Sequence, residues 1–270
     1  MRDELEAAIA AARAGGDVLA AHRDDHGASR SKSSPTDFVT EADIASGVAV
    51  ARCLSDRDRD VRFVIEEEEV YDLAGVARGS LTDPEVWVVD PLDGTTSFIH
   101  GYPCYSVSVA MLRDGRPVAG AVLNAASGEM NAAALGVGAA RDGAPLRVSA
   151  ARHVSDALLI TGFPYDRGRP LDRQLAVLSA FLRAPVHGIR RDGSAAVDCC
   201  HVAAGRADGF WEYGLKPWDM AAGVLIVQEA GGRVTDAYGA PWTAASSSIC
   251  AANPTLHAAM LDVIRGIDLA

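Results

Sequence analysis

The sequence predicts a mixed α/β fold built from two closely joined halves. Two helical patterns open the chain, and β-rich alternating segments follow them up to about residue 150. Beyond that point, short apolar strands alternate with helices. The 270 residues contain no internal repeat, low-complexity tract or long linker. We therefore expect a single domain over 1–270, with an α+β half over about 1–150 and an α/β half over about 151–270.

Helices and strands of the first half follow from local patterns. Apolar residues spaced three and four apart predict a helix over 3–23. Thr40 suits the N-cap of a second helix, and Asp43 stands three residues on, as in a capping box. Residues 70–84 have the composition of an exposed loop. Strands are expected over 62–65, 86–89, 105–111 and 118–123.

The second half restarts the alternation of strands and helices. Ser194 is the expected cap of a helix that ends near Gly205, and Gly231 and Gly232 close a later apolar helix. Helices are expected over 171–182, 193–205, 220–230 and 256–264, and strands over 157–160, 186–189, 209–212, 233–235 and 249–251.

Composition and charge exclude several classes of protein. Hydrophobic residues make up 49% of the chain without a run of 18, which indicates a globular protein without a membrane span. The N-terminal segment is acidic and helical in spacing, unlike a secretory signal. The net charge of −11 argues against broad binding of nucleic acid or anionic membranes. A small phosphorylated substrate is still compatible with this charge, because bound divalent cations invert the local potential.

The five cysteines are scattered, and none lies in a CxxC pair. This usage is typical of reduced, mostly buried thiols in a cytoplasmic protein, which is the location we expect. No flanking signature supports a catalytic cysteine.

The segment from Trp87 to Phe98 carries the strongest chemical signal. An apolar strand ends in Asp90 and Asp93, and Gly94 and Thr95 follow directly. Enzymes built on sheets commonly place their chemistry at strand ends. Oxygen-only ligands suit Mg²⁺, Mn²⁺ or Ca²⁺ rather than zinc or copper. Taken alone, however, a motif of Asp, Pro and Gly is more typical of a turn than of a metal site.

Two further acidic sites lie at the edges of apolar elements. They are the run Glu66 to Glu69, after a strand, and Asp219, at the start of a helix. Carboxylates from separate segments are what a pocket for two or three Mg²⁺ requires, and two metals can hold both oxygens of a displacement at phosphorus. The alternative for the glutamates is a solvated loop. For Asp43, at the start of the second expected helix, the structural interpretation is an acid that offsets the helix dipole.

Together these motifs resemble the inositol monophosphatase family of Mg²⁺-dependent, lithium-sensitive phosphatases. The aspartate-rich turn and the helix start at Trp218-Asp219, in this order, are specific to it. The resemblance implies a layered αβαβα sandwich of the inositol monophosphatase and fructose-1,6-bisphosphatase type. It also implies Mg²⁺ as cofactor with Mn²⁺ as a substitute, and a homodimer without nucleic-acid or membrane partners. The matching segments are 32–43, the acidic run after Ile65, 87–98, 136–139, 193–196, 218–223 and 229–232.

The resemblance also implies roles for individual residues. Asp43 and Thr95 match the pair that activates the attacking water, and Glu67 belongs to the same catalytic set. Glu66 is the alternative to Glu67 as metal ligand, because the glycine before the family's glutamate pair is missing here. Glu212 is alternatively a surface acid near Lys216. The implied metal ligands are Glu67, Asp90, the Leu92 carbonyl, Asp93 and Asp219, and the implied substrate-binding residues are Gly94, Thr95, Gly193, Ser194, Ala196 and Glu212.

The function implied is hydrolysis of inositol monophosphate, or of a similar polyol or sugar phosphate, by a metal-activated water. Related branches offer the same chemistry on fructose 1,6-bisphosphate, 3′-phosphoadenosine nucleotides or histidinol phosphate. A different class of function is a non-catalytic dimer that binds a protein or nucleic acid. The complete ligand set and the acidic charge argue against that last alternative.

Overall fold

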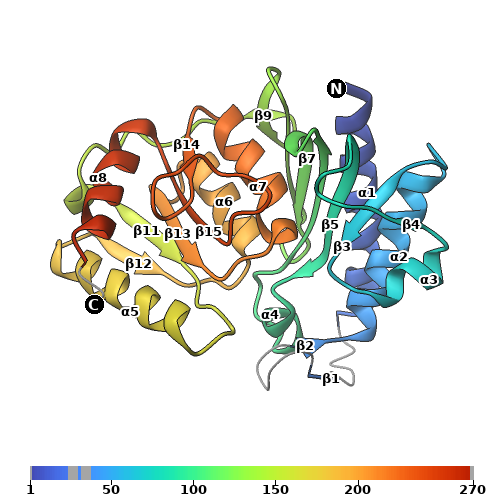
Figure 1. Ribbon diagram of the computed structural model, residues 1–270, viewed down its shortest axis with the longest axis horizontal. Helices are drawn as coiled ribbons and strands as arrows, with labels where there is room; N and C mark the ends of the chain where they lie inside the picture. The colour runs from blue at the N-terminus through green and yellow to red at the C-terminus, as the bar shows by residue number, and fades with distance from the viewer. Residues whose placement is uncertain (1, 24–29, 32–37, 268–270) are drawn as a thin grey trace.

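Five alternating layers of helices and sheets make up the molecule (Figure 1). The computed structural model describes residues 2–23, 30–31 and 38–267. From right to left in Figure 1 the layers are α1 and α2, an eight-stranded sheet, α6 and α7, a five-stranded sheet, and α5 and α8. This arrangement confirms the predicted αβαβα sandwich. Segment 32–37, part of the first matching motif, lies outside the described residues.

The outer layer of the first half contains α1 (Arg2–Ala21) and α2 (Glu41–Ser55). The buried face of α1 consists largely of alanine and glycine, which lets the two helices approach closely. The predicted capping box of α2 is present, because Thr40 caps the Asp43 amide and the Asp43 carboxylate accepts from the Thr40 amide. This box fixes Asp43 at the end of the helix nearest the site.

The eight-stranded sheet has the order β10-β9-β8-β7-β6-β5-β3-β4. In this sheet the pairs β3–β4 and β3–β5 are parallel, and the others are antiparallel. The central strand β5 extends well beyond the predicted apolar run and ends on the motif aspartates. The bounds are β3 (Arg62–Ile65), β4 (Ala77–Arg78), β5 (Glu85–Asp93), β6 (Ser106–Arg113), β7 (Arg116–Asn124), β8 (Glu129–Ala134), β9 (Gly138–Arg141) and β10 (Ala144–Pro145).

The middle helices α6 (Ala195–Ala203) and α7 (Pro217–Glu229) lie between the two sheets. Residues 220–227 of α7 are all buried, because a helix with a sheet on each side has no face toward water. Ser194 caps α6 by accepting from the Val197 amide, as predicted. Both helices direct their N-terminal ends toward the end of β5.

The five-stranded sheet has the order β12-β11-β13-β15-β14 and is covered on its outer face by α5 (Arg169–Arg183) and α8 (Pro254–Arg265). Phe181 of α5 packs on Trp211 of the sheet, with ring centroids 4.6 Å apart. The strands are β11 (Leu158–Thr161), β12 (Gly188–Arg190), β13 (Gly209–Tyr213), β14 (Arg233–Thr235) and β15 (Ser248–Ala252).

The expected loop over 70–84 is wrong in its first part, which is helical, and at the two-residue strand β4. Helix α3 (Glu69–Ala74) begins there, and Val70 and Tyr71 are buried against the outer helices. The Tyr71 hydroxyl accepts from the Ile65 amide and donates to the Phe63 carbonyl, which ties the helix to β3. Short elements complete the description: β1 (Arg30–Ser31), β2 (Phe38–Val39), α4 (Thr95–Ile99) and the 3₁₀ turn Val154–Asp156.

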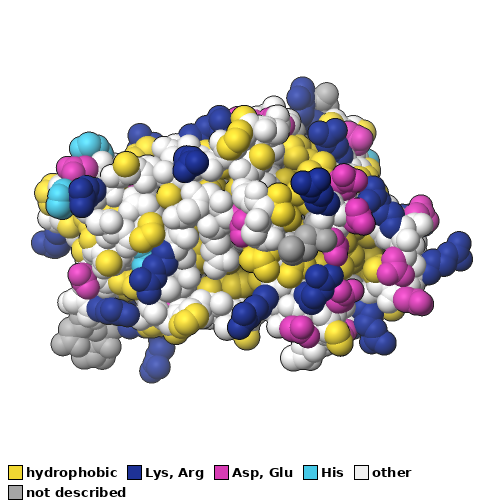
Figure 2. All heavy atoms as spheres, turned by 90° about the horizontal axis from the view of Figure 1, so that it is seen from above, with side chains coloured by type: hydrophobic (Ala, Val, Ile, Leu, Met, Phe, Trp, Pro, Cys, Tyr) yellow, Lys and Arg dark blue, Asp and Glu magenta, His cyan; other side chains and the backbone are white. Residues whose placement is uncertain are grey.

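The surface and the thiols agree with the composition. Acidic and basic side chains intermingle on the face seen in Figure 2, without one continuous basic patch there. All five cysteines are free, and four of them are buried, as expected. None of the described helices combines the length and the apolar character that a membrane-spanning segment requires.

Candidate active site

A β-bulge at the end of β5 places two aspartates in one pocket. Residues three apart in a regular strand point to opposite faces of the sheet. Here Asp90 pairs with Ser108 and Asp93 with Ser106, so three steps along β5 oppose two along β6. The extra residue changes the alternation, and both side chains line the same cavity. The Leu92 amide donates to Asp90 Oδ1 over 3.0 Å, which fixes the turn.

The cavity has a volume of about 80 Å³ and lies where three segments of the chain converge. Glu66 follows β3, Asp90 and Asp93 end β5, and Asp219 lies in the first turn of α7. Asp219 is oriented by the Lys216 amide, which donates to its Oδ2 over 2.8 Å. These four acids come from three segments that are far apart in the sequence, but the fold brings them together at one edge of the larger sheet.

Burial and mutual repulsion raise the pKa values of Asp90, Asp93 and Asp219. Burial raises the pKa of Asp90 well above its ordinary value, and the charges of Glu66, Asp93 and Asp219 raise it further. Burial and the charges of Asp93 and Glu66 likewise raise the pKa of Asp219. For Asp93, burial raises the pKa to about 6, although hydrogen bonds from Ser194 and Ala196 oppose the rise. These groups can all ionise together only when positive charge is brought among them.

The donor chemistry of the pocket fits hard divalent cations. Four carboxyl groups and the nearby Leu92 carbonyl provide only oxygen ligands. Among the described residues, no three acidic, histidine or cysteine side chains already form a group that could hold a metal ion. A cation brought among these carboxylates would attract each of them and offset their mutual repulsion.

Thr95 and Asp43 are joined beside the acidic cluster. The Thr95 hydroxyl lies 3.0 Å from Asp43 Oδ1 and 3.1 Å from the Leu92 carbonyl oxygen, so it donates its proton to these acceptors. Its lone pairs are then free to accept from another donor. The second carboxylate oxygen of Asp43 is held by Thr40. Asp43 thus caps a helix and also orients a hydroxyl in the cavity wall.

The start of α6 closes the other side of the cavity. The Ser194 hydroxyl and the Ala196 amide donate to Asp93 Oδ2 over 2.7 and 2.8 Å. Gly193 and Ser194 line the cavity, whereas the Ala196 amide is engaged by Asp93. Gly94, with φ of 94°, fits between this loop and the loop before β6, because a Cβ there would lie 3.0 Å from the Gly193 and Cys104 carbonyl oxygens.

Glu212 lines the cavity and is not a surface acid. It belongs to β13 and is 7% exposed. Its carboxyl group lies over Gly162, where an added Cβ would come within 2.2 Å of Oε1. Burial raises the pKa of Glu212 well above its ordinary value, and the charges of Asp219 and Asp93 add to this effect. A buried carboxyl in this place is available to a ligand rather than to Lys216.

Comparison with known proteins identifies the family. The model of the inositol monophosphatase family matches residues 1–268. The chain belongs to this family. Its members are phosphoric monoester hydrolases, and the chain is therefore of this enzyme type.

Similar proteins carry two kinds of name. An inositol-1-monophosphatase of Synechocystis is 39% identical over 221 residues, covering 82% of this chain and 74% of that protein. The Nus factor SuhB of Pseudomonas aeruginosa is 40% identical over 269 residues, covering 98% and 97%. A solved inositol monophosphatase from Anabaena superimposes with a TM-score of 0.86 at 34% identity, over 99% of this chain and 97% of that one.

The strand geometry favours Glu66 over Glu67 as the cavity acid of this family member. Phe63 and Ile65 of β3 face the outer helices, whereas Val64 packs toward the middle layer. Alternation then directs Glu66 to the side of Val64, and Glu66 lines the cavity. Glu67 is buried but is not among the cavity-lining residues. The geometry therefore does not support Glu67 as a metal ligand. It supports the alternative, Glu66, because Glu66 lines the cavity.

Two charged residues of the cavity were not predicted from the sequence. Asp198 of α6 lines it, and so does Arg191, the one basic side chain among the described lining residues. Asp198 stands four residues after the cap Ser194, and residues so spaced share a helix face. This spacing could have indicated that Asp198 faces the cavity. The apolar residues around Asp198, however, are typical of an ordinary core helix.

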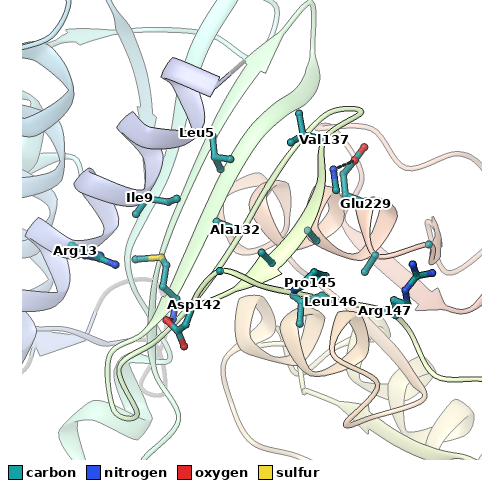
Figure 3. Close-up of a pocket in the computed structure, with 17 residues that line it drawn as sticks. Leu5, Ile9, Arg13, Ala132, Val137, Asp142, Pro145, Leu146, Arg147 and Glu229 are labelled. Atoms are coloured by element: carbon teal, nitrogen blue, oxygen red, sulfur yellow. Dashed lines mark hydrogen bonds between the residues drawn. The ribbon is translucent and has the colours of Figure 1, made fainter.

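A larger groove of about 570 Å³ lies elsewhere, between α1, the β9–β10 hairpin and the end of α7 (Figure 3). Its walls are mostly apolar, and Glu229 on its rim accepts from the Gly136 and Gly138 amides over 2.9 and 2.8 Å. The family motif over 136–139 thus serves to join β8 and β9 to α7. A groove without converging buried carboxyls does not suit phosphoester chemistry, which belongs to the smaller cavity.

Proposed function

We propose that the chain is a Mg²⁺-dependent phosphomonoesterase that hydrolyses inositol monophosphate or a similar polyol phosphate. The observation that carries this proposal is the convergence of Glu66, Asp90, Asp93 and Asp219 on one cavity, beside the Thr95–Asp43 pair. Family membership and the name of the Synechocystis relative support the same activity.

The residues that would hold the cations are Glu66, Asp90, Asp93, Asp219 and the Leu92 carbonyl. Mg²⁺ bound there, or Mn²⁺ in its place, supplies positive charge that offsets the anionic phosphate and lowers the pKa of a coordinated water. Ser194 and Ala196 hold Asp93 in a fixed orientation from the α6 side. Glu67 keeps its place in the family's catalytic set only as a prediction.

Thr95 and Asp43 would position the attacking water. Because the Thr95 hydroxyl donates to Asp43, its oxygen is left to accept a hydrogen bond from water. Asp43 then takes the proton that the hydroxyl passes on. Gly94 and Thr95 line the same cavity, and we propose that their amides hold the phosphate. Gly193, Ser194 and Glu212 would face the alcohol part of the substrate.

The substrate class is tested by phosphate release from a panel of esters at saturating Mg²⁺. The panel contains inositol 1-phosphate, fructose 1,6-bisphosphate, a 3′-phosphoadenosine nucleotide and histidinol phosphate. We expect the highest kcat/KM for inositol 1-phosphate and loss of activity with a chelator. A higher kcat/KM for the nucleotide than for inositol 1-phosphate would refute the polyol phosphate as substrate. It would still agree with metal-dependent hydrolysis of a phosphate ester.

A second candidate function is favoured by the name of the Pseudomonas relative, a Nus factor. Such a role would rest on surfaces for partners and not on the cavity carboxyls. An Asp90→Asn variant separates the two. Loss of phosphate release together with an intact cellular role would show that the cellular role does not depend on catalysis. A cytoplasmic location and a homodimer stay predictions.

A further inference from the structure

Asp198 is a buried carboxyl group that the reaction described above does not use. Its side chain is 1% exposed, and neither of its oxygens has a hydrogen-bond partner among the described residues. Leaving a buried polar group unpaired destabilises the folded protein, because the group has lost its hydrogen bonds to water. A residue with that cost, in the first turns of a well-packed helix, calls for a function.

The position of Asp198 indicates where its partner comes from. It lines the same cavity as Ser194, Gly193 and Glu212. Burial raises the pKa of Asp198 well above its ordinary value, the charges of Glu212, Asp192 and Asp93 add to this, and Arg191 opposes it. A neutral carboxyl offers one donor and one acceptor, which is the pattern a hydroxyl can satisfy.

We propose that Asp198 is a specificity-determining residue of the alcohol subsite, where its carboxyl group hydrogen-bonds a hydroxyl of the bound polyol, directly or through one water. This inference rests on the proposed function and names the group that selects the alcohol. Glu212 lines the same cavity, and its charge acts on Asp198, so the two carboxyls together can engage more than one hydroxyl of a polyol.

The selection follows from the cost of leaving a buried polar group unpaired. A site built to hydrogen-bond a substrate hydroxyl discriminates strongly against an analogue without it. A polyol phosphate satisfies Asp198, whereas the phosphate ester of a plain alcohol leaves it in its unpaired state. The hydrogen bond that Asp198 forms with the bound substrate compensates for the stability that its unpaired carboxyl removes from the free protein.

The test compares inositol 1-phosphate with cyclohexyl phosphate, which has the same ring without the free hydroxyls. Where turnover of cyclohexyl phosphate is too slow, its competitive inhibition constant replaces kcat/KM. We expect Asp198→Leu to lower kcat/KM for inositol 1-phosphate roughly tenfold or more and to change the value for cyclohexyl phosphate less than about threefold. Asp198→Asn, which keeps a donor and an acceptor, should retain most of the selectivity.

Stability provides a second readout. Because Asp198→Leu removes an unpaired polar group from the interior, we expect its Tm to equal or exceed that of the parent. Cys200→Ala, two residues along α6 and away from the cavity, is the matched control and should leave the substrate ratio unchanged. Should the leucine variant not fold, Asp198→Ala takes its place in the substrate comparison.

Two outcomes separate failure of this inference from failure of the proposed function. Equal losses on both esters, or an unchanged ratio in the leucine and alanine variants, would overturn the role of Asp198. Absence of phosphate release from inositol 1-phosphate by the parent protein would instead overturn the proposed function.

Discussion

The hydroxyl of Thr95 donates a hydrogen bond of 3.0 Å to the carboxylate of Asp43, which stands 52 residues earlier in the chain. The capping box with Thr40 holds that carboxylate in place, so the bond joins the first turn of α2 to the first residue of α4, directly after β5. A helix cap thereby fixes the direction of a hydroxyl in the cavity.

Removing either member of this pair should slow turnover more than it weakens cation binding. We expect Thr95→Ala and Asp43→Asn each to lower kcat about 10²- to 10³-fold, the range of a lost proton-transfer partner. The Mg²⁺ concentration for half-maximal activity should change less than about threefold. Kinetics at varied Mg²⁺ measure both quantities. A kcat within threefold of the parent would contradict the role of the pair.

Replacing a cavity aspartate should abolish activity but stabilise the cation-free protein. Asp90→Asn and Asp219→Asn each remove one of several carboxyls that raise one another's pKa. We expect loss of nearly all phosphate release, and a Tm in chelator equal to or above that of the parent, because repulsion is relieved. The exposed Asp262 of α8 provides the control as Asp262→Asn. Parent-like turnover of either cavity variant at saturating Mg²⁺ would exclude the assignment.

The two neighbouring glutamates should differ in their effect on cation affinity. Glu66 lines the cavity with Asp90, whereas Glu67 does not. We expect Glu66→Gln to raise the Mg²⁺ concentration for half-maximal activity about tenfold or more, and Glu67→Gln to raise it less. Titration of activity with Mg²⁺ compares the variants directly. A larger rise for Glu67→Gln than for Glu66→Gln would instead show that Glu67 is the metal ligand.

His257 of α8 should make stability fall in mild acid. It is fully buried and hydrogen-bonded to Thr235, and burial lowers its pKa from 6.5 to about 4. The unfolded chain therefore takes up a proton below about pH 6.5 that the folded protein accepts only near pH 4. This contribution is complete above pH 6.5 and is lost as the pH falls toward 4. Between pH 7 and pH 5 the free energy of unfolding of the parent, measured with urea, should fall by about 2 kcal/mol relative to that of His257→Gln. Equal losses in both proteins would contradict it.

Local patterns were sufficient for most of the fold. Spacing and caps predicted α2, including the box between Thr40 and Asp43, and the cap of α6 at Ser194. They failed over 70–84, where four glutamates and nearby glycines concealed the burial of Val70 and Tyr71. Such burial depends on what the remainder of the chain places beside a segment, and local composition does not contain that information.

The site was predictable in its residue types more than in its geometry. Asp90, Asp93 and Asp219 were found from their motifs, and the structure brings them together. The choice between Glu66 and Glu67 needed the alternation of β3 against two different layers, which the short apolar run before the glutamates did not define. The contact of Thr95 with Asp43 spans separate elements and depends on the packing of α2 against β5.

Diffraction from crystals soaked with Mn²⁺ and phosphate tests the central claim most directly. Anomalous scattering locates each cation independently of assumptions about its ligands. We predict one or more peaks in the cavity, coordinated by Asp90, Asp93 and Asp219 at about 2.0–2.3 Å, with the phosphate adjacent to Thr95. A fully occupied Mn²⁺ elsewhere on the protein, with no peak among these three aspartates, would contradict the claim.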